Sequence, residues 1–138
     1  MRLLSLLVLC GFTLAPSAFA AEQLSFEPKV VQLSGLLTLQ SFYGPANHGE
    51  SPNADRVEVW PILELDAPID VAAVPKEPDS IDTKTMLGVK RIQLVTSAEM
   101  RNRLGHRITV EGRLSSPAVA HDRTDAIMWV TRIVSDNP

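Results

Sequence analysis

The sequence predicts an all-β domain with one short helix. Apolar residues recur mostly at every second position, the pattern of strands that bury one face. Five such segments are separated by stretches rich in Gly, Pro, Asn and Asp, which favour turns and loops. A single segment, residues 96–105, carries the start and stop signals of a helix.

The first predicted strand spans residues 30–40. Its apolar face would hold Val31, Leu33, Gly35, Leu37 and Leu39, while glutamines, Ser34 and Thr38 fall on the other face. Because a glycine inside a strand often marks a bulge or a bend, we expect one at Gly35.

The second and third predicted strands span residues 57–65 and 90–95. The second would face inward with Val57, Val59, Leu63 and Leu65. Pro61 has no N–H to donate, which indicates a sheet edge or a bulge there. Residues 67–88, which contain three prolines and several acids, are predicted to form an exposed, irregular connection.

A helix of about two turns is expected between the third and fourth strands. Thr96 and Glu99 are spaced as a capping box, and Gly105 supplies the stop. The fourth strand, residues 106–114, alternates with Ile108, Val110, Gly112 and Leu114 inward. The fifth, residues 126–134, is apolar on both faces and is therefore predicted to be central.

The predicted order is β-β-β-α-β-β, which is that of a five-stranded OB-fold-like barrel. OB-folds bind ligands on a face framed by the loop between strands one and two and the loop between strands four and five. Here these loops are residues 42–56 and 115–125. The predicted ligand-binding residues within them are Tyr43, Asn47, His48, His121 and Arg123.

Residues 1–20 are typical of a secretory signal peptide. Arg2 supplies the positive charge, residues 3–14 the apolar region, and Ala18-Phe19-Ala20 a small-x-small cleavage site. The apolar run of about 12 residues is shorter than the ~20 that a spanning helix needs, so we expect cleavage and no stable membrane insertion. Residues 21–138 are then one domain, located in the periplasm.

Cleavage would remove Cys10, the one cysteine of the chain. The mature protein would have no disulfide, no cysteine-based metal site and no nucleophilic cysteine. Residues 22–82 contain 11 acids and 3 bases, whereas residues 83–138 contain 5 acids and 9 bases. This asymmetry predicts either a polarised surface or, if strands of the two halves interleave, charges that mix.

Several short motifs resemble the bacterial family called domain of unknown function 4431. They are Phe42-Tyr43-Gly44-Pro45-x-Asn47, Leu63-x-Leu65-Asp66-x-Pro68-Ile69, Gln93-Leu94 and Gly105-x-Arg107-x-x-Val110-x-Gly112-x-Leu114. The resemblance extends from about Val31 to Val130 and implies an exported protein. Many members carry a histidine-rich loop before the last strand, which this chain matches at His121 and Thr124, and Asp70 stands where a cysteine is common.

The function predicted from these observations is a non-catalytic binding module for an envelope protein or a glycan, without a cofactor. An inhibitor or immunity-type protein is a special case of that class. The alternative is a metal-binding periplasmic protein, with His48 and His121 joined by carboxylates such as Asp55, Asp122 or Asp125. The sequence contains no motif that places a nucleophile beside a base, so an enzyme is not predicted.

Nucleic-acid binding is not predicted either. A sequence-tolerant OB-fold binder uses a positive groove and aromatic stacking platforms, whereas this chain has a net charge of −3 and 5% aromatic residues. Trp129, in the apolar fifth strand, is expected in the core. Trp60 is expected on the face opposite Val59 and Leu63, where it would stack a sugar or pack under a loop.

Overall fold

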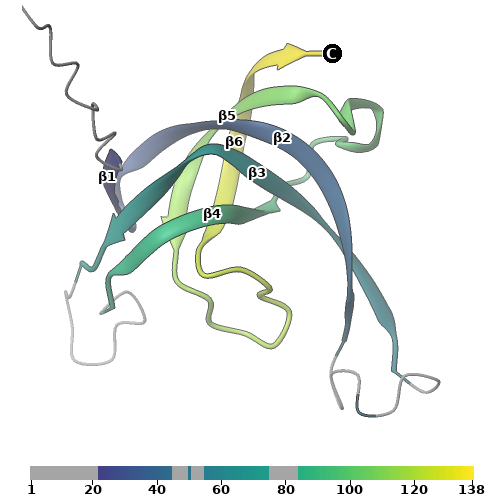
Figure 1. Cartoon of the computed structure of the whole chain (residues 1–138), viewed down its shortest axis with the longest axis horizontal. Coiled ribbons are helices and arrows are strands. Elements are labelled where there is room, and N and C mark those ends of the chain that lie inside the picture. The colour runs from purple at the N-terminus through teal and green to yellow at the C-terminus, as the bar shows by residue number, and fades with distance from the viewer. Residues whose placement is uncertain (1–21, 45–49, 51–54, 75–83) are drawn as a thin grey trace, which may run out of the picture.

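The computed structural model describes residues 22–44, 50, 55–74 and 84–138, and in these ranges the protein is all-β. The strands are β1 (Glu22–Ser25), β2 (Val30–Tyr43), β3 (Val57–Ala72), β4 (Met86–Val95), β5 (Arg107–Ser115) and β6 (Ile127–Asn137). They form one sheet in the order β1-β3-β2-β5-β6-β4, and β3 also pairs with β4 (Figure 1). The five pairings among β2 to β6 therefore form a ring.

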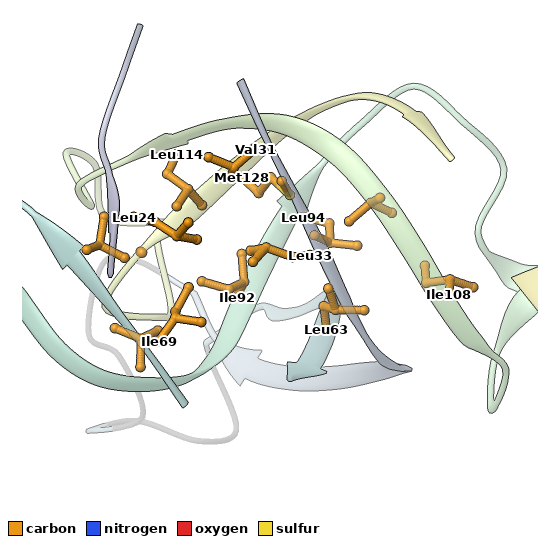
Figure 2. Packing of buried hydrophobic residues seen from close by; sticks show 14 of the residues in the cluster. Leu24, Val31, Leu33, Leu63, Ile69, Ile92, Leu94, Ile108, Leu114 and Met128 are labelled. Carbon is orange, nitrogen blue, oxygen red and sulfur yellow. The ribbon is translucent and has the colours of Figure 1, made fainter. Parts of the chain in front are cut away.

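Inward-facing side chains of the ring form the core. The predicted alternation is confirmed for β5 and for β2 as far as Leu37: Val31, Leu33 and Leu37 are buried, and so are Ile108, Val110 and Leu114. Side chains from these strands point toward those of β3, β4 and β6 (Figure 2). The backbone of β2 approaches that of β3 closely at Gly35, and β5 approaches β6 closely at Gly112. A Cβ at either glycine would lie 2.2 Å from a backbone oxygen of the neighbouring strand.

Two strands extend into the segment that we predicted to be irregular. β3 continues to Ala72, and β4 begins at Met86 instead of residue 90. The β3–β4 register shifts between Glu64 and Ile69, so Pro68 lies at an irregularity of the ladder. Residues 75–83 of the predicted connection lie outside the described residues.

β1 was not predicted. It pairs in parallel with Ile69–Ala72 of β3 and brings Leu24 and the following Phe26 into the core. A strand of four residues beside the signal peptide is too short for its alternation to be distinguished from chance.

The predicted two-turn helix is wrong. The segment forms a single 3-10 helix, η1 (Arg101–Arg103), followed by Gly105 with a positive φ of 81°. The Thr96 hydroxyl accepts a hydrogen bond from the amide of Ala98, and the Glu99 carboxylate accepts one from Arg101. Each side chain thus bonds two residues ahead, which stabilises local turns in place of a capping box.

The outer half of the β2–β3 hairpin extends beyond the ring (Figure 1). β5 pairs with β2 only as far as Leu36, and β4 pairs with β3 only from Ile62. Residues 39–43 of β2 and 57–61 of β3 therefore pair only with each other among the described strands. We call these two segments the hairpin arm.

Four apolar residues lie outside the core against expectation. Leu39, Val57 and Val59 are 40%, 60% and 53% exposed because they belong to the hairpin arm, where the ring no longer covers them. Trp129 is 52% exposed, since it lies on the outer face of β6 opposite Arg113. Its indole N–H donates to the Ser115 hydroxyl at 3.0 Å.

Candidate functional site

The hairpin arm has two chemically different faces. Because side chains alternate along a strand, the face that continues the core carries Leu39, Tyr43, Val57 and Val59, all of them exposed. The opposite face carries Phe42, Glu58 and Trp60, which are partly buried. One face is thus apolar and open, and the other is covered.

Residues of the β5–β6 loop cover the second face through a shared carboxylate. One Glu58 oxygen lies 2.7 Å from Nδ1 of His121, and the other accepts a hydrogen bond of 3.0 Å from Nη2 of Arg123. The Trp60 indole N–H lies 3.4 Å from the second oxygen. The Arg123 guanidinium also lies over the Phe42 ring, 5.8 Å from its centroid.

These contacts stabilise the ionised form of Glu58. The hydrogen bonds from His121 and then from Arg123 lower the pKa of the Glu58 carboxyl from 4.5 to about 2, against a smaller opposing effect of desolvation. Glu58 is therefore a carboxylate at neutral pH. Its role here is to hold the loop, because both of its oxygens already have partners.

The β5–β6 loop is also held by Gln93 of β4, a buried residue that is 1% exposed. Its side-chain oxygen accepts a hydrogen bond from the Arg123 amide, and its side-chain nitrogen donates to the His121 carbonyl. The Thr124 hydroxyl in turn accepts a hydrogen bond from the backbone N–H of Gln93 and donates one to the Ala126 carbonyl. A buried amide that pairs with two loop backbone groups sets the loop's position.

Tyr43, His121 and Arg123, the described residues of the predicted site, all lie at the hairpin arm. They lie on its two opposite faces. His121 and Arg123 contact Glu58, which pairs with Phe42 across the arm. Tyr43 pairs with Val57 and lies on the other face. Asn47 and His48 lie outside the described residues.

The carboxylates proposed for a metal site with His121 are not its partners here. Asp122 accepts hydrogen bonds from the amides of Ala118 and Val119, which close a turn. Nδ1 of His121 pairs with Glu58 instead. Within the described ranges, no three His, Cys, Asp or Glu residues are grouped so that they could hold a metal ion.

Sequence reasoning did not find Glu58, Phe42 or Gln93. Glu58 lies in a predicted strand with nothing local to separate it from a solvated acid. A signal was present in the alternation itself, because Glu58, Trp60 and Phe42 fall on the strand faces that oppose the apolar positions. Which loop would cover that face depends on the fold of the whole chain.

A shallow groove of about 230 Å³ adjoins the open face of the arm. Leu39, Val59 and Pro61 line one side, and the segment from Thr96 to Arg101, with the buried Met100, lines the other. The exposed apolar surface of the arm thus continues into a concave wall. Such an exposed apolar patch is typical of a binding surface.

No helix in the described ranges is long and apolar enough to cross a membrane. Comparisons with protein-family models, with curated proteins and with solved structures give no match to this chain.

Proposed function

We propose that this protein is an exported, non-catalytic binding module of the periplasm or cell envelope. Its recognition surface would be the end of the molecule formed by the hairpin arm and the β5–β6 loop. Tyr43, His121 and Arg123 belong to that end, and Asn47 and His48, which lie outside the described residues, stay part of the proposed ligand-binding set.

The proposal includes the OB-fold and the resemblance to domain of unknown function 4431. The ring order β3-β2-β5-β6-β4, with a parallel β4–β6 pair, supports a five-stranded OB-fold-like barrel preceded by the added strand β1. In such a barrel the β2–β3 and β5–β6 connections frame the ligand face. These are the two connections that Glu58 joins through His121 and Arg123.

The observation that carries the proposal is the open apolar face of the arm. Leu39, Val57 and Val59 would contribute more to stability if they were buried, yet two strands extend beyond the core to present them. The other face of the same arm is fixed by the Glu58 contacts, which reduces the entropy cost of binding. A protein partner with an apolar contact surface fits this arrangement.

The test is capture of partners from envelope extract by the immobilised mature protein and by a Val57→Ser/Val59→Ser variant. We expect one specific protein partner, lost in the variant, since truncating apolar contacts at the centre of an interface weakens binding strongly. Leu87→Ser is the matched control. Leu87 is 74% exposed and lies near the Val71–Met86 pair at the other end of β3. Equal capture by all three proteins would contradict the proposal.

A further inference from the structure

The hairpin arm leaves a row of backbone groups on β2 without a neighbouring strand (Figure 1). The N–H and C=O groups of Leu37 both point to the β5 side, where they bond residues 105 and 106. Because backbone direction alternates along a strand, the same groups of Leu39, Ser41 and Tyr43 also point to that side, away from β3. No described strand pairs with β2 there. We call residues 39–43 the β2 edge.

The other side of the arm is closed to an added strand. Leu39 pairs with Pro61, and since the backbone groups of Leu39 point away from β3, the nitrogen of Pro61 points away from β2. This nitrogen carries no hydrogen, and a proline at a sheet edge prevents further pairing. The segment from Thr96 to Arg101 also lies across the groove from Val59 and Pro61. A strand could therefore add to the arm at the β2 edge but not at β3.

The β2 edge lacks the charges that commonly protect a free strand edge from pairing. Beyond Trp129, for example, β6 pairs only with β5 among the described strands, and this part of β6 carries Arg132 and Asp136. Residues 39–43 carry no charge and no proline. Two copies of this edge can therefore approach each other without repulsion between charged side chains of the edge.

The β2 edge is also complementary to itself. If two copies pair antiparallel about Ser41, the two Ser41 residues lie opposite each other, and Leu39 lies opposite Tyr43 of the second copy. Every outward N–H and C=O group of these three residues then has a partner in the other copy. Leu39 and Tyr43 are both exposed on the open face of the arm, so this register places apolar side chains side by side.

A hollow of about 200 Å³ lies at the outer end of the β2 edge, lined by Ser41, Phe42, Tyr43 and Val57. In the register centred on Ser41, Leu39 of the second copy lies opposite Tyr43 and thus beside this hollow. An exposed leucine and an open hollow at matching positions of one edge are what a two-fold contact requires, because each copy supplies both.

We propose that the β2 edge binds a second copy of this chain, so that the two arms form one continuous sheet across a two-fold axis at Ser41. Strand addition in the plane of the sheet leaves the open apolar face of each arm accessible. The dimer is therefore an additional property of the arm, compatible with the partner binding proposed above and independent of it.

The test is sedimentation equilibrium of the exported protein, of Ser41→Lys, of Ser41→Glu and of an equimolar mixture of the two variants. We expect the parent to dimerise with a dissociation constant in the micromolar range, because a short strand pair buries less than a standard interface. Each variant alone should associate at least about tenfold more weakly, since like charges would face each other at the axis. The mixture should restore dimers, because lysine then faces glutamate, and this result also requires that both variants are folded.

Ser34→Lys is the matched control. Ser34 is an exposed serine of the same strand, but β5 occupies the strand edge there, so this variant should dimerise as the parent does. Equal weakening in Ser34→Lys, or a mixture that stays monomeric, would overturn the proposal. So would a parent that is monomeric at all concentrations; if Ser41→Lys then also lost capture of an envelope protein, the β2 edge would accept a strand of that protein instead.

Discussion

Gly112 lies where the backbone of β5 closely approaches that of β6. A Cβ at this position would lie 2.2 Å from the Trp129 carbonyl oxygen and 3.0 Å from the Val130 Cα, so backbone would have to move. We expect Gly112→Ala to lower the free energy of unfolding by about 2 kcal/mol or more. Thermal and denaturant unfolding measure this.

Gly44→Ala is the comparison for that variant. Its Cβ would lie 3.0 Å from the Glu58 carboxylate and 3.2 Å from the Arg56 carbonyl, which are longer distances than the 2.2 Å at Gly112. We expect a loss of about 1 kcal/mol, smaller than for Gly112→Ala. A larger loss at Gly44 than at Gly112 would contradict this description of the two sites.

Glu58 gives the fold a defined dependence on pH. Its pKa is lowered from 4.5 to about 2 in the folded protein, so the folded state binds the proton less readily than the unfolded state. The stability that its ionised form contributes is complete above pH 4.5 and is lost as the pH falls toward 2. Unfolding of the parent protein and of Glu58→Gln between pH 7 and pH 2 should show a stability difference that shrinks across this window.

Glu111 provides a second, independent case of the same effect. Hydrogen bonds from Arg132 and Gln32 lower the pKa of the Glu111 carboxyl to about 2. Glu111→Gln should therefore lose its difference from the parent over the same pH range as Glu58→Gln. A difference that grows toward low pH, for either variant, would contradict the assigned contacts.

At the scale of elements, the position of the β5–β6 loop depends on Gln93. Replacing Gln93 by Leu would leave the His121 carbonyl and the Arg123 amide without this partner in a site that is nearly closed to water. We expect a loss of stability of about 1–3 kcal/mol and faster amide exchange at Arg123. Hydrogen exchange followed by NMR measures both the local and the global effect.

Gln32→Leu is the control for Gln93→Leu. Gln32 is exposed, and its side chain donates to the Glu111 carboxylate at 2.8 Å. We expect its substitution to change stability by about 0.5 kcal/mol or less and to leave Arg123 exchange unchanged. If Gln93→Leu behaved in the same way, the loop would be fixed by Glu58 alone.

Strands with one buried face could be predicted from the sequence, and elements that depend on distant residues could not. The alternation of β2 and β5 predicts Val31, Leu33, Ile108 and Val110 as core, and they are buried. The same alternation wrongly predicted that Val57 and Val59 are buried, because a period of two identifies a face of the strand but not what covers it. The helix prediction was wrong because Thr96 and Glu99 are equally suited to local turns.

The candidate site was predictable in part, for the same reason. His121 and Arg123 were placed in a loop that the fold brings to the hairpin, and both contact the arm. Their partner Glu58 lies more than sixty residues away in sequence, and no local pattern connects such positions. Nor did the sequence indicate that Tyr43 would lie on the opposite face of the arm from them.

At the scale of the whole molecule, export is the first property to measure. The small-x-small site at residues 18–20 predicts a mature chain that begins at Ala21. We expect the intact mass of protein from the envelope fraction to match residues 21–138 without added groups. A chain that begins at Cys10 with an attached lipid, as in a lipoprotein, or a chain that still begins at Met1, would contradict the predicted cleavage.

The central claim is that the open face of the hairpin arm binds a protein partner. The most direct measurement is photo-crosslinking in living cells, with the crosslinking residue placed at Val59 on the arm or at Trp129 on the outer face of β6, both about half exposed. We predict a discrete crosslinked protein from Val59 that disappears when Val57→Ser is added, and none from Trp129. The same product from both positions, or a product from Trp129 alone, would contradict the claim.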